Sequence, residues 1–225
     1  MKNKIKIALI GFGKMGQEIN SLCKESEIFE VVSVSYKNIS DELDLKGIAQ
    51  ADIAIDFTSK DVVIKNIEAV AKLGKNLVVG TTGWYSDLEM VKEIVDKYKV
   101  GLIYSPNFSV GVNIFFKIME FSAKLFDKFP EYDKYGLEIH HKAKLDSPSG
   151  TALKIASKVK GLNFTSMRAG RNPGFHEVVF DSNADGITLS HQAYNRMGFA
   201  KGALVATEFI KNKKGVYTFE DVLKQ

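Results

Sequence analysis

The sequence predicts an α/β fold: a Rossmann-type, doubly wound parallel sheet with a second α+β domain built on an open mixed sheet. Three observations carry this prediction. Apolar, β-branched runs alternate with segments of helical spacing, a glycine-rich turn follows the first run directly, and the rhythm changes after Pro106. Strands that alternate with helices in this way pair in parallel through right-handed crossovers, which produces a doubly wound sheet.

Each element of the first domain has its own signal. The run IKIALI at 5–10 indicates a buried strand, and Met15, Ile19 and Leu22 after the glycine turn share one helical face. Further strands are expected at 31–35, 51–57, 77–79 and 100–104, with helices over 62–73 and 87–98.

The second domain is expected to begin with a long amphipathic helix over 112–129. Short strands at 135–139, 176–181 and 187–192 favour an open, mostly antiparallel sheet. A further helix is expected from Arg196, and we expect the terminal YTFEDVL to pack back on the first domain. The predicted domains are therefore 1–106 plus 196–225, and 107–195.

Composition limits the classes of function. A chain of 225 residues with 45% hydrophobic content can bury the cores of two modest domains. The net charge of +4 comes without the dense basic clusters of nucleic-acid binders, and it suits an anionic substrate and cofactor. Cys23 is the only cysteine, which excludes an intrachain disulfide and a cysteine-based metal site. The first apolar run is too short to span a membrane, so we expect a cytoplasmic protein.

The turn after the first strand fits the dinucleotide-binding pattern GxGxxG. Gly11 and Gly13 would permit a tight turn and close approach of a pyrophosphate, and Gly16 would permit close packing of helix against strand. The helix start would face the phosphates with its partial positive charge. We therefore expect the whole loop to contact the cofactor, including Phe12, Lys14 and Met15.

The end of the second strand bears on the choice of cofactor. NAD-specific sites usually hold the adenosine ribose with a carboxylate about twenty residues beyond the glycine motif. Ser35 and Lys37 stand there instead, and they would tolerate a 2′-phosphate. This favours NADPH or use of both NADPH and NADH, unless Lys37 is simply a solvated loop lysine.

Two further loops fall at the carboxyl edge of the predicted sheet, where ligands of such folds bind. One follows the strand at 77–79 and the other follows the strand at 100–104. Their candidate cofactor-binding residues are Gly80, Thr81, Thr82, Ser105, Pro106, Asn107 and Phe108. The small residues would let a nicotinamide ring lie against backbone, and the Asn amide and Phe ring would contact its carboxamide end. The alternative is that both loops are structural turns.

The segment EIHHKAKLDSPSGT at 138–151 concentrates the candidate chemistry. His140 can supply a proton near neutral pH, and Lys144 can hold a developing anion or a carboxylate. His141 reaches the same ligand only if the strand ends there and the loop turns. Ser149 is a good N-cap, and backbone N–H groups at the start of the following helix would bind a carboxylate.

Blander interpretations compete for the same residues. Two adjacent histidines rarely bind one ion, and no distant third ligand is spaced to join Glu138 and Asp146, so we predict no metal site. Asp146 is expected to orient the loop or a lysine. His176 and His191 lie in strand-like contexts and are expected to be structural.

Taken together, the motifs resemble the 4-hydroxy-tetrahydrodipicolinate reductase (dihydrodipicolinate reductase) family, in order and over nearly the whole chain. They are GFGKMG, DFT at 56–58, VVGTTGW, SPNFSVGVN, EIHHKAKLDSPSGTA, RAGRNPGFHEVVF and FAKGAL. The resemblance implies a cytoplasmic enzyme of the diaminopimelate route to lysine. It would use NADH or NADPH to reduce a small cyclic dicarboxylate, with loss of water, to tetrahydrodipicolinate.

The resemblance also implies roles for single residues. His140 would be the proton donor, and Lys144 would take part in catalysis and dicarboxylate binding. His141, Gly150 and Thr151 would bind substrate, and the glycine-rich and strand-end loops named above would bind the dinucleotide. Ser149 is added to the candidate substrate-binding residues because it starts the same helix. Residues 107–195 would also join four copies through the second sheet. The chain departs from the family in shorter loops and in lacking the acidic residue after the second strand, which argues against a strict NADH preference.

Two rival functions stay open at this stage. One is a different two-domain dehydrogenase, although the lack of a cysteine near the start of the second domain disfavours the thiol-dependent aldehyde type. The other is a non-catalytic regulator that binds a dinucleotide.

Overall fold

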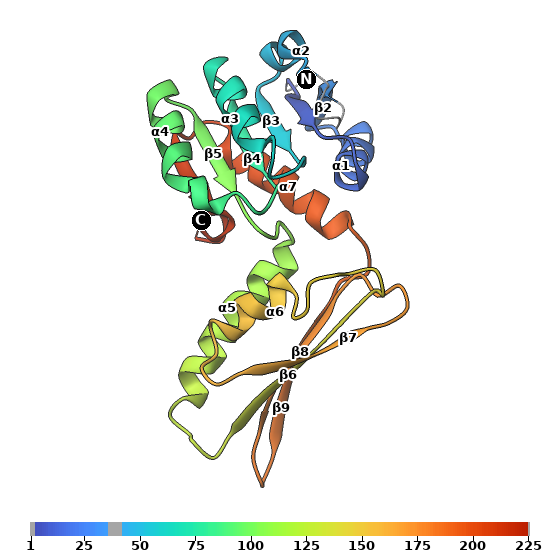
Figure 1. The fold of residues 1–225 in the computed structure, drawn as a ribbon, viewed down its shortest axis with the longest axis vertical. Coiled ribbons are helices and arrows are strands. Elements are labelled where there is room, and N and C mark those ends of the chain that lie inside the picture. The colour runs from blue at the N-terminus through green and yellow to red at the C-terminus, as the bar shows by residue number, and fades with distance from the viewer. Residues whose placement is uncertain (1–2, 36–41, 225) are drawn as a thin grey trace. The chain divides into compact units, whose positions relative to one another are not determined.

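The computed structural model describes residues 3–35 and 42–224, which form two compact units. The first unit comprises residues 1–109 and 199–225, and the second comprises residues 110–198 (Figure 1). None of the described helices is long and apolar enough to cross a membrane.

The first unit is built on a parallel sheet, as predicted. Its strands follow the order β10-β5-β4-β3-β1-β2, and every neighbouring pair is parallel. The strands are β1 (Ile5–Ile10), β2 (Phe29–Ser35), β3 (Ile53–Asp56), β4 (Asn76–Val79), β5 (Gly101–Tyr104) and β10 (Gly215–Thr218). The order reverses between β1 and β3, so the carboxyl ends of these two strands mark the position where doubly wound sheets bind ligands.

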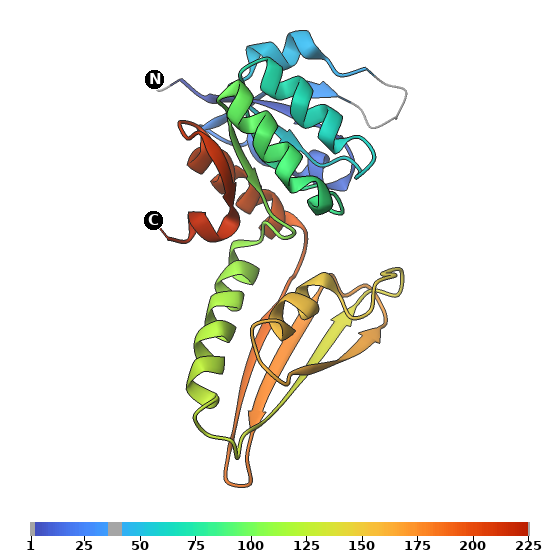
Figure 2. The same cartoon turned by 60° about the vertical axis from the view of Figure 1, so that its left-hand side comes forward.

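Helices cover this sheet, and the central strands are buried at every residue, as parallel sheets require. The helices of this unit are α1 (Lys14–Lys24), α2 (Leu45–Gln50), α3 (Val63–Lys72), α4 (Leu88–Tyr98), α7 (Met197–Ile210) and α8 (Phe219–Val222), with a 3₁₀ turn at Tyr85–Asp87. Figure 2 shows α3 and α4 side by side on one face, where they share a core with side chains of β3, β4 and β5. The short helix α2 and the strand β10 were not predicted.

The returning end of the chain joins the first sheet through β10, which pairs with β5. A buried amide holds this return in place. The side chain of Asn76 accepts a hydrogen bond from the Gly101 N–H at 2.7 Å and donates to the Ile210 carbonyl at 2.7 Å. Because Asn76 lies on β4, one side chain links the middle of the sheet to residues more than a hundred positions later.

The second unit is a mixed four-stranded sheet of order β7-β6-β8-β9, in which only the β6–β7 pair is parallel. Its elements are α5 (Val110–Phe126), β6 (Asp133–His140), α6 (Gly150–Ala156), β7 (Asn163–Arg168), β8 (Phe175–Asp181) and β9 (Gly186–Gln192). Both helices lie on one face of the sheet (Figure 1) and contribute to the core there. In this core Phe126 stacks on Phe180 with ring centroids 4.2 Å apart. The mixed α+β architecture is as predicted, whereas β7 was missed.

Candidate active site

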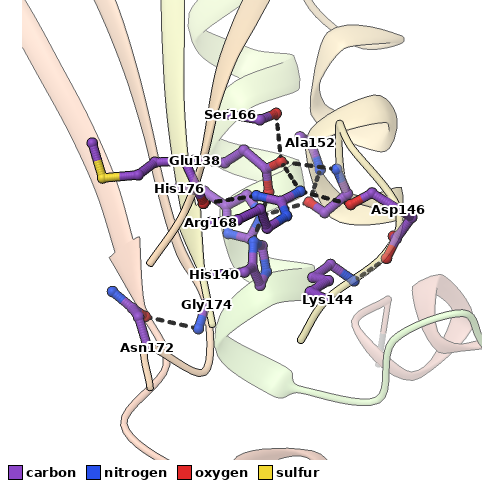
Figure 3. Close-up of polar contacts among 12 residues, drawn as sticks. Glu138, His140, Lys144, Asp146, Ala152, Ser166, Arg168, Asn172, Gly174 and His176 are labelled. Atoms are coloured by element: carbon purple, nitrogen blue, oxygen red, sulfur yellow. Dashed lines mark hydrogen bonds and ion pairs between the residues drawn. The ribbon is translucent and has the colours of Figure 1, made fainter. Parts of the chain in front are cut away.

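Five polar side chains meet on one face of the second sheet because of strand register. Glu138 and His140 are two residues apart on β6 and therefore share a face. Ser166 and Arg168 lie opposite them on β7, and His176 lies opposite Glu138 on β8. Three neighbouring strands thus bring a carboxylate, a guanidinium and two imidazoles together (Figure 3).

Glu138 lies at the centre of this cluster, and its side chain is fully buried. Its Oε1 accepts hydrogen bonds from the Ser149 N–H at 3.0 Å, the Ser166 hydroxyl at 2.7 Å and the Arg168 guanidinium at 2.6 Å. Burial raises the pKa of this carboxyl, but these donors outweigh burial and lower the pKa to about 2. Glu138 is therefore ionised at neutral pH despite its burial.

His140 lies beside the second oxygen of Glu138. Its Nδ1 is 2.7 Å from Oε2, although the two groups are not aligned for a good hydrogen bond and neither atom forms a hydrogen bond with another described residue. Burial lowers the pKa of His140, Glu138 raises it, and the positive charges of Lys144 and Arg168 lower it again. The other ring nitrogen, Nε2, faces Gly174, where an added Cβ would stand 3.1 Å away.

Lys144 lies in the loop between β6 and α6, where its ammonium contacts the Asp146 carboxylate at 2.7 Å (Figure 3). This ion pair agrees with one of the two roles expected for Asp146, and whether Asp146 orients Lys144 stays a prediction. Burial raises the pKa of Asp146, but the contact with Lys144 lowers it overall. The strand ends at His140 and the chain turns, since the Lys144 N–H bonds the His141 carbonyl at 3.0 Å. This turn is the condition under which His141 can reach the same ligand as His140.

Ser149 is the N-cap of α6, as predicted, and its hydroxyl accepts a hydrogen bond from the Ala152 N–H at 3.1 Å. The helix begins at Gly150 and includes Thr151. The Ser149 hydroxyl also lies 3.1 Å from His176 Nε2. Burial lowers the pKa of His176 to about 3, so this ring is neutral at physiological pH.

Three residues of the cluster, Ser166, Arg168 and His176, were not recognised from sequence as site residues. His176 was expected to be structural, yet its ring lies 5.1 Å from that of His140. Arg168 was noted only as part of a motif. All three gain their place through pairing of β6 with β7 and β8, which local sequence does not reveal. His191, in contrast, packs beside Phe115, as a structural residue would.

The same cluster bears on the metal prediction. Ligand-type atoms of Glu138, His140 and His176 lie within 4.8 Å of one another, a grouping that could hold an ion. Arg168 and Lys144 place two positive charges around it, and Arg168 binds Glu138 directly. A metal ion would have to displace these two positive charges or overcome their repulsion. The group of residues therefore suits proton transfer better than metal binding. The expectation of no metal stays a prediction.

In the first unit, the glycine loop has the geometry of a dinucleotide cradle. Gly11 has φ +89°, and an added Cβ would stand 2.3 Å from the Phe57 carbonyl oxygen. At Gly16 an added Cβ would stand 2.2 Å from the Gly11 carbonyl oxygen. At Gly13 it would meet nothing within 4 Å, so that glycine leaves open space beside the start of α1. Phe12, Lys14 and Met15 complete the loop and the first turn of this helix.

The loop after β4 is held by a buried carboxyl that was noted from sequence only as part of the motif DFT. Asp56, at the end of β3, accepts hydrogen bonds from the hydroxyls of Thr81 and Thr58, each at 2.7 Å, and from the Asn66 amide at 2.8 Å. Burial raises the pKa of Asp56, and these donors oppose the rise. The network sets the position of the candidate loop from Gly80 to Thr82.

The loop after β5 is braced by its own side chains. The Ser105 hydroxyl donates to the Asn107 carbonyl at 2.6 Å, and the Asn107 side chain accepts from the Ser109 N–H at 2.9 Å. Phe108 is only 2% exposed and packs edge-on against Phe57 and Phe219. Little of its ring is therefore left for a ligand, and cofactor contact by residues 105–108, Pro106 among them, stays a prediction.

The end of β2 is described only in part. Ser35 is buried, its carbonyl accepts from the Gly11 N–H at 3.1 Å, and its hydroxyl accepts from the Asp44 N–H at 3.3 Å. Ser35 thus lies directly against the glycine loop. Lys37 lies outside the described residues, so its predicted role stays a prediction.

Family models match both parts of the chain. The model described as dihydrodipicolinate reductase, N-terminus, matches residues 5–108, and the one described as dihydrodipicolinate reductase, C-terminus, matches residues 111–223. A 4-hydroxy-tetrahydrodipicolinate reductase of Christiangramia forsetii is 38% identical, over 97% of this chain and 98% of the relative. One of Methanosarcina acetivorans is also 38% identical, over 92% of this chain and 87% of the relative.

Solved structures agree with these matches. Dipicolinate-bound dihydrodipicolinate reductase from Paenisporosarcina sp. TG-14 matches with a TM-score of 0.79 and 25% identity, over 96% of this chain and 98% of that one. Fold and site together define a class, the NAD(P)H-dependent oxidoreductases that join a dinucleotide-binding sheet to a separate α+β unit. Within that class, the chain belongs to the dihydrodipicolinate reductase family.

Proposed function

We propose that this chain catalyses the reduction of 4-hydroxy-tetrahydrodipicolinate to tetrahydrodipicolinate, with loss of water, in the diaminopimelate route to lysine. The observation that carries the proposal is the meeting of His140, Lys144 and the Ser149 helix start in one segment of a chain that belongs to this family. NADPH or NADH, when bound, supplies the hydride. The glycine loop fits such a cofactor because open space at Gly13 lies beside the start of α1.

His140 is the proposed proton donor. It is almost fully buried, its Nδ1 faces the ionised Glu138, and its Nε2 faces the small residue Gly174. A donor must hold a proton near neutral pH and release it to a substrate within hydrogen-bond reach. The nearby carboxylate favours the protonated ring, while burial and the neighbouring cations favour release.

Lys144 is the proposed partner of the substrate carboxylates. Its ammonium binds the carboxylate of Asp146 at 2.7 Å, and this supports affinity of the same group for a substrate carboxylate. His141, Ser149, Gly150 and Thr151 lie in the same turn and helix start, so we assign them to substrate binding. The relative from Paenisporosarcina binds dipicolinate, a compact aromatic dicarboxylate, and this supports a cyclic dicarboxylate as the ligand.

We assign dinucleotide binding to 1–106 plus 196–225, and substrate binding and assembly to 107–195. The open face of the second sheet, opposite the candidate site, exposes Tyr135 and Met167, each close to half exposed. Apolar exposure of this kind supports assembly of copies through this face, as a homotetramer. A cytoplasmic location is part of the same proposal.

The test of function follows oxidation of NADPH and NADH in parallel, on substrate made freshly from pyruvate and aspartate semialdehyde. Lys144→Ala should abolish turnover, whereas Lys142→Ala, an exposed lysine of the same segment, should leave it nearly unchanged. His140→Gln should lose turnover and still bind cofactor. A wild-type protein that binds both cofactors but turns over neither would contradict the reductase and favour a regulator.

Cofactor choice needs its own variant. Lys37→Ala should lower kcat/KM for NADPH and leave that for NADH unchanged, because only NADPH carries the 2′-phosphate that the lysine would neutralise. An unchanged kcat/KM with both cofactors would favour the alternative that Lys37 is a solvated loop residue.

A further inference from the structure

We propose that Glu138 is a positioning residue, which fixes the orientation of the proton-donating His140 and ties it to the loop that begins α6. The inference rests on the proposed function, because it assigns a task within that reaction. Glu138 touches no substrate in this account, and it acts through the groups that its two oxygens hold.

The first step is that the carboxylate of Glu138 has no freedom to rotate. Its Oε1 accepts from three donors on two separate segments, namely Ser149 before α6 and the pair Ser166 and Arg168 on β7. Its Oε2 lacks a hydrogen bond of good geometry among the described residues and faces two rings, with His140 Nδ1 at 2.7 Å and His176 Nε2 at 3.8 Å. The saturated oxygen therefore anchors the group, and the other oxygen is left for His140.

The two ring nitrogens of His140 have different roles, and only one of them exchanges a proton with the substrate. A carboxylate beside Nδ1 favours a proton on that nitrogen, and a small tilt of the ring would complete the hydrogen bond. Nε2 is then the nitrogen that gains and loses the exchanging proton. Gly174 is consistent with this assignment, because a side chain there would crowd Nε2.

The third step is the charge balance around His140. The groups that face it are Glu138 on its own strand, Lys144 in the following loop, Arg168 on β7 and neutral His176 on β8. Glu138 is the sole negative charge among these four. Without it, burial and the two cations would act together against the protonated ring, and the pKa of His140, which is already lowered, would fall further.

The fourth step links the donor to the substrate loop. The Ser149 N–H binds Glu138 Oε1, and the Ser149 hydroxyl caps α6 and contacts His176. The buried carboxylate of Glu138 therefore fixes two groups. It orients the ring of His140, and it holds Ser149, where the proposed carboxylate-binding turn leads into α6. This common anchor gives a role to a charged group at the centre of a buried sheet face.

The decisive measurement is the pH dependence of kcat/KM for Glu138→Gln in the full-length enzyme, beside Glu177→Gln as a matched control on β8. The active form needs protonated His140, so activity falls as pH rises through its pKa. Removal of the carboxylate should move this alkaline limb to lower pH by about 1 to 3 units, with activity partly recovered in acid. The control should keep the wild-type limb.

A second readout does not depend on turnover. The chain has four histidines, so ring ¹⁵N and ¹³C signals can be assigned by single substitutions. In the wild type we expect neutral His140 to carry its proton on Nδ1, and in Glu138→Gln we expect its pKa to fall by about 1 to 3 units. If Glu138→Gln does not fold, Arg168→Gln should shift the His140 pKa in the opposite direction, upward.

The outcomes separate this inference from the proposed function. Suppose the wild type turns over, while Glu138→Gln keeps the alkaline limb of its pH profile and its His140 signals unchanged. This result would overturn the positioning role and leave the reductase activity intact. A uniformly lower rate at every pH would indicate a merely structural residue. Absence of wild-type turnover would contradict the proposed function, while the histidine signals would still decide whether Glu138 controls His140.

Discussion

Replacement of two glycines in the same loop should separate folding from cofactor binding. Alanine at Gly11 must adopt φ +89° and place its Cβ 2.3 Å from the Phe57 carbonyl oxygen. A left-handed conformation costs about 1–2 kcal/mol, and overpacking costs about 1–3 kcal/mol. Gly11→Ala should therefore lower the free energy of unfolding by about 2–5 kcal/mol, a large part of a typical stability.

Alanine at Gly13 has the opposite profile. Gly13 has φ −73°, an allowed value, and its Cβ would meet no protein atom within 4 Å, so the cost to stability should be under about 1 kcal/mol. The same Cβ would occupy the space through which a pyrophosphate approaches. If that contact costs about 1–3 kcal/mol, the Kd for NADPH rises about 5- to 150-fold.

Urea unfolding and fluorescence titration with NADPH measure the two effects separately. The prediction for Gly13→Ala is a stable protein with weak cofactor binding. Normal binding in a normally folded Gly13→Ala protein would refute the placement of the pyrophosphate. A Gly11→Ala protein as stable as the wild type would refute the account of the turn.

Three further predictions concern the second unit. Asp146→Asn should strengthen inhibition by dipicolinate about 1.4- to 5-fold. The reason is that the exposed ion pair between Asp146 and Lys144, worth about 0.2–1 kcal/mol, no longer competes with dipicolinate for the lysine. Weaker inhibition would show that Asp146 instead holds the lysine in place. Folding lowers the pKa of His176 from its ordinary value of 6.5 to about 3. The unfolded chain therefore binds a proton at a higher pH than the folded protein, and the free energy of unfolding should fall as pH drops from 6.5 towards 3. His176→Gln should reduce that slope in urea unfolding at a series of pH values, and an unchanged slope would contradict the assignment. Phe180→Ala should cost about 3–5 kcal/mol of unfolding free energy through loss of the stack on Phe126, with NADPH binding unchanged; a loss below about 1 kcal/mol would contradict the core described here.

The parallel sheet was predictable because each of its first five strands is an apolar run followed by a turn or a helical period. The missed elements lack that signal. Strand β7 alternates exposed and half-buried residues and has no apolar run, so only its pairing with β6 makes it a strand. Strand β10 is four half-buried residues that complete an edge beside β5. In both cases tertiary pairing outweighs local propensity.

The candidate site shows the same limit. His140, Lys144 and Ser149 could be predicted because they lie within one segment whose residue types and spacing indicate proton transfer, anion binding and a helix cap. His176 and Arg168 are about thirty residues further along and become neighbours of Glu138 only through strand register. Register depends on which side chains pack across the sheet, and this information is spread over β6, β7 and β8.

The hydrogen bonds of the Asn76 side chain have a consequence for folding during synthesis of the chain. Its amide binds the carbonyls of Ile210 and Lys213, and β10 follows within a few residues. A ribosome therefore releases the complete second unit before it delivers the last strand of the first. Until then β5 has an unpaired edge, and such edges are prone to pair with other chains. Nascent chains that stall shortly before β10 should consequently depend on chaperones more than chains that carry it.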